Sequence, residues 1–159
     1  MNRIVILGTG HATVTRCYNT CFVLQTDTTT LLVDAGGGNG ILQRLEQAGV
    51  AIKDLHHMYV THAHTDHILG TIWVIRMLLS AAGYEGQFHV YSHAKVLRVI
   101  SMICGETLSA KHRRLMGERV VMHEVGDGTG FNVGDIGMQS FDIHSKKEPQ
   151  YGFRATLPG

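Results

Sequence analysis

The amino-acid sequence predicts a single α+β domain over residues 1–159. Short apolar runs rich in β-branched residues occur toward both ends of the chain, as expected for strands. Two longer apolar runs in the middle have the length and spacing of helices. The chain is long enough to form one hydrophobic core and too short for two domains, so we expect one domain.

The composition is that of an ordinary globular protein, with 44% hydrophobic and 17% charged residues. The net charge of +1 gives no electrostatic argument for or against a polyanionic partner. No apolar run reaches the roughly 20 residues of a membrane-spanning helix, and a strand-like run begins at Arg3, so we expect neither a membrane segment nor an export signal. Cys17, Cys21 and Cys104 are expected to be reduced, which predicts a cytoplasmic protein.

The first third of the chain is expected to form strands and one helix. An apolar run over residues 3–7 predicts a strand. A hairpin is predicted at Thr20–Thr26 and Thr29–Val33, because both runs are rich in β-formers and a polar turn separates them. A helix is predicted over Asn39–Ala48, where apolar residues recur at helical spacing and Gly49 marks the end.

The middle and the end of the chain continue this alternation. A strand is predicted over Leu55–Thr61 and a buried helix over Ile68–Ala82, which is apolar on most sides. A second strand and helix are predicted over Phe88–Ser92 and Ala94–Ser109. Further strands are predicted over residues 119–125, 131–133 and 137–144, with a last run over 151–156.

Four good metal ligands lie within six positions, between the predicted strand and the predicted helix: His62, His64, Asp66 and His67. In an extended chain alternate side chains point the same way, so His62 and His64 can converge on one ion. Asp66 and His67 then turn toward the same pocket as the helix begins. Imidazole and carboxylate ligands suit zinc. The alternative is a histidine-rich loop without metal, but an aspartate among three histidines leaves polar groups that a metal would satisfy together.

This motif resembles the HxHxDH signature of the metallo-β-lactamase fold. Two further stretches narrow the resemblance. Leu7-Gly8-Thr9-Gly10 followed by Tyr18-Asn19-Thr20 is similar to the opening of the ribonuclease Z and phosphodiesterase branch, and Leu32-Val33-Asp34-Ala35-Gly36 is similar to the supporting aspartate turn of the family. The resemblance implies an αβ/βα four-layer sandwich made of two similar halves.

The resemblance also implies a set of metal ligands. His62, His64 and His144 would hold the first of two zinc ions, and Asp66 and His67 would contribute to the second. For His144 the alternative is a surface histidine at the end of a strand. Because His/Asp sites accept several divalent ions, manganese or iron could take the place of zinc.

Two aspartates have further implied roles. Asp34 would hydrogen-bond to the ligand loop and orient it, and its alternative role is to cap a turn or a helix start. Asp66 is the candidate catalytic residue, which would orient the attacking water or accept its proton. The resemblance assigns no substrate-binding residue in this chain.

The implied activity is metal-dependent hydrolysis of phosphodiester bonds. The leading substrate is a transfer RNA precursor, cut at its 3′ end as by ribonuclease Z. A small-molecule phosphodiesterase or an arylsulfatase-like hydrolase is the alternative enzyme. From another class, the chain could be an inactive zinc-binding half-domain that needs a partner fragment. The family often forms homodimers, so a homodimer is a possible assembly.

The sequence departs from the family pattern after His144. The bridging aspartate and the last histidine of the second metal site are not in this sequence, and Glu148 is the one acidic residue that follows His144. We therefore expect a domain that is incomplete at its C-terminal side, with an apolar sheet face left uncovered. Truncation, cleavage with a complementing C-terminal fragment, and a stable remnant without enzymatic activity are the three explanations.

Overall fold

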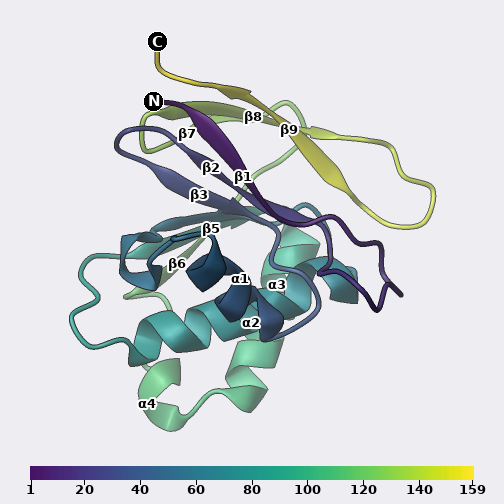
Figure 1. The fold of residues 1–159 in the computed structure, drawn as a ribbon. Helices are drawn as coiled ribbons and strands as arrows, with labels where there is room; N and C mark the ends of the chain where they lie inside the picture. Colours follow the sequence, from purple (N-terminus) through teal and green to yellow (C-terminus); the bar gives the residue numbers. More distant parts are fainter.

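A computed structural model describes residues 1–159 as layers of helices and sheets (Figure 1). The larger sheet has six strands in the order β1-β2-β3-β4-β5-β6, and the smaller sheet has three in the order β7-β8-β9. The helices cover one face of the larger sheet, and the smaller sheet lies over its other face (Figure 1). The predicted α+β class is confirmed. No helix combines the length and the apolar composition needed to cross a bilayer.

The strands are β1 (Arg3–Gly8), β2 (Cys21–Gln25), β3 (Thr30–Val33), β4 (His57–Tyr59), β5 (Phe88–Ser92), β6 (Val120–Glu124), β7 (Gly130–Val133), β8 (Ile136–Asp142) and β9 (Tyr151–Thr156). The helices are α1 (Gly40–Gln47), α2 (Thr65–Ser80), α3 (Ala94–Thr107) and α4 (Ala110–Arg113), with a short 3-10 helix at Ile52–Asp54.

The direction of the strands places the candidate metal ligands at one edge of the larger sheet. Strands β1, β2 and β3 pair antiparallel, which confirms the predicted hairpin, whereas β3, β4, β5 and β6 pair parallel. Each parallel step crosses through helices: α1, then α2, then α3 with α4. The C-terminal ends of the parallel strands therefore meet at one edge. The segments that follow β3, β4 and β5 all leave the sheet there.

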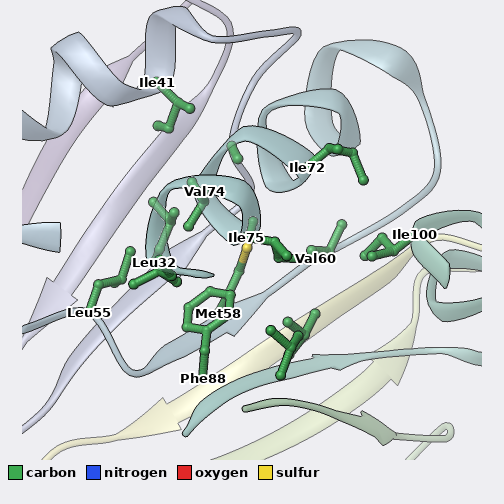
Figure 2. Close-up of a cluster of buried hydrophobic side chains, with 14 of the residues drawn as sticks. Leu32, Ile41, Leu55, Met58, Val60, Ile72, Val74, Ile75, Phe88 and Ile100 are labelled. Atoms are coloured by element: carbon green, nitrogen blue, oxygen red, sulfur yellow. The ribbon is translucent and has the colours of Figure 1, made fainter. Parts of the chain in front are cut away.

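Two hydrophobic clusters cover the two faces of the larger sheet. Met58 belongs to the cluster beneath the helices, and Tyr59 belongs to the cluster between the sheets. This alternation follows from the pleat, which sends successive side chains to opposite faces. Figure 2 shows Ile41 of α1, Ile75 of α2 and Ile100 of α3 packed with side chains of the central strands. Since both faces are buried there, β3 carries the apolar run Leu31-Leu32-Val33.

The end of β4 and the start of α2 differ from the prediction, and both changes affect the metal motif. Strand β4 covers His57–Tyr59 and is shorter than predicted, so the chain leaves the sheet before the ligands. Helix α2 begins at Thr65, three residues before the predicted Ile68. Asp66 and His67 therefore lie in the first turn of a helix, which fixes their backbone.

An apolar strip on β1 is exposed. Ile4 and Ile6 are 62% and 58% exposed, although Leu24, which pairs with Ile4, is buried between the sheets. The intervening Val5 packs against the cluster beneath the helices. Ile4 and Ile6 therefore lie on the face that the smaller sheet covers elsewhere. That the domain is incomplete, with an apolar sheet face left uncovered, stays a prediction.

Candidate metal centre

The loop between β4 and α2 brings the predicted ligands together at the sheet edge. The ring centroids of His62 and His64 are 4.6 Å apart, and those of His62 and His67 are 4.1 Å apart. An oxygen of Asp66 lies 3.3 Å from Nε2 of His67. All four residues of the motif thus form one cluster, as the sequence predicts.

Asp34 ties this loop to the end of β3. Its Oδ1 accepts a hydrogen bond from the backbone N–H of Thr61 at 2.8 Å, and its Oδ2 accepts one from the Thr61 hydroxyl at 2.8 Å. The same Oδ2 lies 2.7 Å from Nδ1 of His67. Asp34 is buried and has a left-handed backbone with a φ of 54°, a conformation that a non-glycine residue keeps only where its surroundings fix it.

Close packing of α2 on the turn after Asp34 also needs a glycine. The N–H of Ala35 donates to the carbonyl of His67 at 3.0 Å, and the N–H of Gly70 donates to the carbonyl of Gly36 at 2.9 Å. A Cβ atom at Gly70 would lie 1.8 Å from the Ala35 carbonyl oxygen. Residue 70, three positions after the motif, is therefore a glycine because the helix and the turn touch there.

Two of the imidazoles have Nδ1 engaged by a neighbouring side chain. Nδ1 of His62 lies 2.8 Å from the Thr61 hydroxyl, and Nδ1 of His67 faces Asp34. Burial lowers the pKa of His62, and the neighbouring His67 lowers it further. Burial also acts to lower the pKa of His67, but the hydrogen bond and the charge of Asp34 outweigh it and raise that pKa. In both residues Nε2 is the nitrogen left for a metal.

A residue from the loop between β8 and β9 joins the cluster. Ligand atoms of His62, His64 and Glu148 all lie within 4.8 Å of one another. Oε1 of Glu148 is 2.5 Å from Nε2 of His64, and Oε2 is 2.6 Å from the Lys95 ammonium. The hydrogen bond from Lys95 is the main reason that the pKa of Glu148 is lowered.

His144 lies in the same loop but outside this group. Its side chain is 84% exposed, and its Nδ1 lies 3.9 Å from an Asp142 oxygen. Its backbone has a left-handed φ of 55°, and its N–H donates to Oδ1 of Asp142 at 2.8 Å. The structure does not bring His144 into contact with His62 or His64, and its role as a metal ligand stays a prediction.

The residues of the cluster fit a divalent transition metal. Oε1 of Glu148 is buried and has no hydrogen-bond partner, although it lies between two imidazoles. Imidazole nitrogens and carboxylate oxygens, which the motif supplies, are donors that zinc, and also manganese or iron, accepts in proteins. Asp66 and His67 offer a second group of donor atoms beside the first.

Sequence reasoning missed Lys95 and Glu148 as site residues. Lys95 follows β5 by three positions, and β5 is the parallel neighbour of β4, whose end carries the ligands. That adjacency is the signal that could have found Lys95. Glu148 belongs to the polar turn that follows His144, and only the fold shows that this turn reaches the cluster.

The chain is similar in sequence to a known family and to several known nucleases. The family model described as "Anti-Pycsar protein Apyc1" matches residues 2–155. Ribonuclease Z of Streptomyces avermitilis is 38% identical over 79 residues, which are 49% of this chain and 26% of that protein. Ribonuclease Z of Aeropyrum pernix is 30% identical over 141 residues, and exodeoxyribonuclease YycJ of Bacillus anthracis is 30% identical over 128 residues. These two matches cover 87% and 79% of this chain and 42% of each relative, so the chain spans less than half of these proteins.

Solved structures share the fold. Human tRNase Z, short form, superposes with a TM-score of 0.77 at 17% identity, over 99% of this chain and 64% of that chain. A diphosphatase from the PhnP family has a TM-score of 0.72 at 17% identity, over 96% of this chain and 61% of that chain. The metallo-β-lactamase fold protein YhfI from Bacillus subtilis has a TM-score of 0.70 at 18% identity, over 96% and 57%. The chain therefore has the metallo-β-lactamase fold.

Proposed function

The chain belongs to the family of anti-Pycsar protein Apyc1, and from this premise we propose that it is a metal-dependent hydrolase of phosphodiester bonds. The observation that carries the proposal is the cluster of His62, His64, Asp66 and His67 at the edge of the larger sheet. Its donor set suits a divalent metal, and the chain is similar to several nucleases of the same fold.

The ligand residues would hold the metal in two groups. His62 and His64 would hold a first ion together with His144, as the family resemblance implies, and Asp66 and His67 would contribute to a second. A bound zinc ion would supply Lewis acidity toward the phosphoryl oxygens and lower the pKa of the water that it holds. Asp34 fixes the ring of His67 and the backbone of the loop, so that the donor atoms are in place before substrate binds.

We assign to Asp66 the role of accepting the proton of the attacking water. Its carboxylate lies within the cluster, in the first turn of α2, where the helix holds its position. From there it would orient the attacking water and accept its proton as the water oxygen bonds to phosphorus and the bond from phosphorus to the leaving ester oxygen breaks. The leaving oxygen would take up a proton from solvent.

For the substrate, a transfer RNA precursor is the first candidate, because several relatives are ribonuclease Z proteins. A small phosphodiester is the second candidate, and one structural observation favours it. A cavity of about 440 Å³ lies beside Asp66 and is lined by Tyr18, Asn19 and the glycine turn that follows Asp34. That volume is in the range of small-ligand pockets.

The proposal is tested with zinc-loaded wild-type chain and bis(p-nitrophenyl) phosphate as the probe. We expect measurable hydrolysis that falls by about 10²–10⁴-fold or more in Asp66→Ala, as for the loss of a residue that handles the proton. Asp54→Ala, which removes an exposed aspartate elsewhere, should retain the wild-type rate. Zinc binding without hydrolysis by the wild-type chain would contradict the proposal and favour the half-domain that needs a partner fragment.

The two substrate classes are then separated directly. A transfer RNA precursor and a small diester such as a 3′,5′-cyclic nucleotide are offered to the same enzyme at equal concentration. A higher kcat/KM for the precursor supports the ribonuclease Z type of activity. A higher value for the small diester supports the second candidate and excludes the first as the preferred substrate.

A further inference from the structure

The three imidazoles of the cluster differ in how their ring nitrogens are engaged. His62 and His67 each have Nδ1 engaged, by the Thr61 hydroxyl at 2.8 Å and by Asp34 at 2.7 Å. Each therefore keeps Nε2 for a metal. A metal-binding histidine generally gives its other ring nitrogen to a carboxylate, carbonyl, or water, and this second contact sets the tautomer and the ring orientation.

His64 is engaged at the opposite nitrogen. Oε1 of Glu148 lies 2.5 Å from Nε2 of His64, and no protein hydrogen bond engages Nδ1. Oε1 forms no hydrogen bond in this arrangement, because it lies away from the direction in which an Nε2–H bond of His64 would point. The side chain of His64 is 48% exposed, so the ring has room to rotate until its Nε2–H bond points at Oε1. If Glu148 engages Nε2, the nitrogen left for a metal is Nδ1.

The separation of Oε1 and Nε2 indicates that Glu148 contacts the His64 ring directly. It also indicates that these two atoms are not two ligands of one metal ion. Two atoms bound to one zinc ion at roughly 2.0–2.1 Å in a tetrahedral site lie about 3.3 Å apart. A charge-assisted N–H···O contact is about 2.7–2.9 Å long. The observed separation of 2.5 Å is much closer to the second value.

Lys95 keeps Glu148 in this position. Its ammonium donates to Oε2 at 2.6 Å, which leaves Oε1 to face His64. Lys95 lies in the first turn of α3, directly after β5, so a rigid element anchors the loop between β8 and β9. The side chain of Glu148 is 11% exposed, and a carboxylate this deep needs both partners.

We propose that Glu148 is a positioning residue for the metal centre, which accepts a hydrogen bond from Nε2–H of His64 and turns Nδ1 of that ring toward the metal. Lys95 holds Glu148 in place. The inference rests on the metal site of the proposed function and assigns a supporting role to Glu148 and Lys95, which lie outside its ligand set.

The test measures the tautomer and the zinc affinity of the full chain. NMR of chain labelled with ¹⁵N-histidine identifies the protonated ring nitrogen of His64, and we expect Nε2–H in the metal-free chain and zinc on Nδ1 after loading. Competition with a chromophoric chelator gives the zinc affinity, which should fall by about 10–100-fold in Glu148→Ala. Glu148→Gln should lose less, because its amide oxygen still accepts the hydrogen bond. Lys95→Met should lose an amount between these two.

Two matched variants control for the loss of surface charge. Glu106→Ala and Lys147→Met remove exposed side chains that form no ion pair, and both should bind zinc like wild type. Three outcomes would overturn the inference: zinc on Nε2 of His64, wild-type affinity in Glu148→Ala, or equal losses in Glu148→Gln and Glu148→Ala, which would make Glu148 a ligand itself. A wild-type chain that binds no zinc would overturn it as well.

The outcome for this inference can be told apart from the outcome for the proposed function. The NMR and chelator measurements need no turnover, so a chain with the expected tautomer and no hydrolysis refutes only the proposed activity. Hydrolysis by a chain whose Glu148→Ala variant keeps full zinc affinity refutes only the positioning role.

Discussion

Asp34 and His144 stand at opposite extremes of exposure within one predicted site. The Asp34 side chain is 7% exposed and is hydrogen-bonded to the loop that it supports, whereas the His144 side chain is 84% exposed and its Nδ1 lies 3.9 Å from an Asp142 oxygen. Both residues have a left-handed backbone, at φ values of 54° and 55°. In Asp34 the buried surroundings hold this conformation, and in His144 a local turn holds it.

The candidate metal centre therefore has a side fixed by the sheet and a side carried by a loop. On the fixed side, Asp34, Thr61 and His67 come from the ends of β3 and β4 and the start of α2, and hydrogen bonds join them. On the loop side, the one anchor of Glu148 to a helix is the ion pair with Lys95. We expect substitutions on the fixed side to affect folding and metal binding together, and those on the loop side to affect metal binding alone.

The largest effect is expected for Asp34→Ala. The variant removes the acceptor for the Thr61 N–H and the partner of His67, so the free energy of unfolding should fall by about 1–3 kcal/mol. Zinc affinity should fall by about 10–100-fold or more in the same variant. Urea unfolding and chelator competition measure the two effects. An Asp34→Ala chain with wild-type stability and reduced zinc affinity would contradict the expectation that substitutions on the fixed side affect folding and metal binding together.

The next effect tests the packing of α2 on the fixed side. Gly70→Ala places a Cβ atom 1.8 Å from the Ala35 carbonyl oxygen, and the backbone must shift to accommodate it. We expect a loss of about 1–3 kcal/mol in the free energy of unfolding, together with weaker zinc binding.

Gly105→Ala in α3 is the matched control for this prediction. No atom lies within 4 Å of a Cβ at Gly105, so alanine should stabilise the helix by about 1 kcal/mol at most. If Gly70→Ala and Gly105→Ala change the midpoint of urea unfolding in the same direction, the close approach of α2 to the Asp34 turn does not matter for stability.

His144→Ala examines the loop side. Because the side chain is 84% exposed, the free energy of unfolding should stay within about 0.5 kcal/mol of wild type. The family resemblance predicts that zinc affinity nevertheless falls, since the loop would have to bring His144 to the metal. Unchanged affinity in His144→Ala would remove His144 from the ligand set and leave Glu148 as the one residue of this loop in the metal centre.

The smallest expected effect is the pH dependence of the pair between His67 and Asp34 in metal-free chain. Asp34 raises the pKa of His67 above its ordinary value of 6.5. The extra stability is therefore fully present below pH 6.5 and is lost as the pH rises through the raised pKa. The difference in free energy of unfolding between wild type and Asp34→Asn should shrink over that rise. A difference that grows with pH would contradict the direction of the shift.

The fixed side could be predicted from the sequence, and the reasons are local. His62, His64, Asp66 and His67 lie within six positions between a strand and a helix, so their proximity does not depend on the rest of the fold. The hairpin of β2 and β3 was equally predictable from its β-formers and polar turn. The early start of α2 at Thr65 was not, because hydrogen bonds to the Asp34 turn extend the helix beyond its apolar run.

The loop side could not be predicted in the same way. Lys95 and Glu148 are 53 positions apart, and only the stacking of the two sheets brings them together. The direction of the His144 side chain depends on its left-handed backbone and on Asp142, and neither is evident from the position of a histidine at the end of a strand. Pairs that the tertiary fold creates are beyond what spacing and periodicity predict.

We propose that the cluster at the sheet edge binds metal. A crystal structure of the zinc-loaded chain, with anomalous data recorded at the zinc absorption edge, tests this binding. The account predicts an anomalous peak among the imidazoles of His62 and His64, with His64 bound through Nδ1 and Glu148 beside its Nε2. An anomalous map without a peak at this cluster, or with zinc only at a distant surface histidine, would contradict the account.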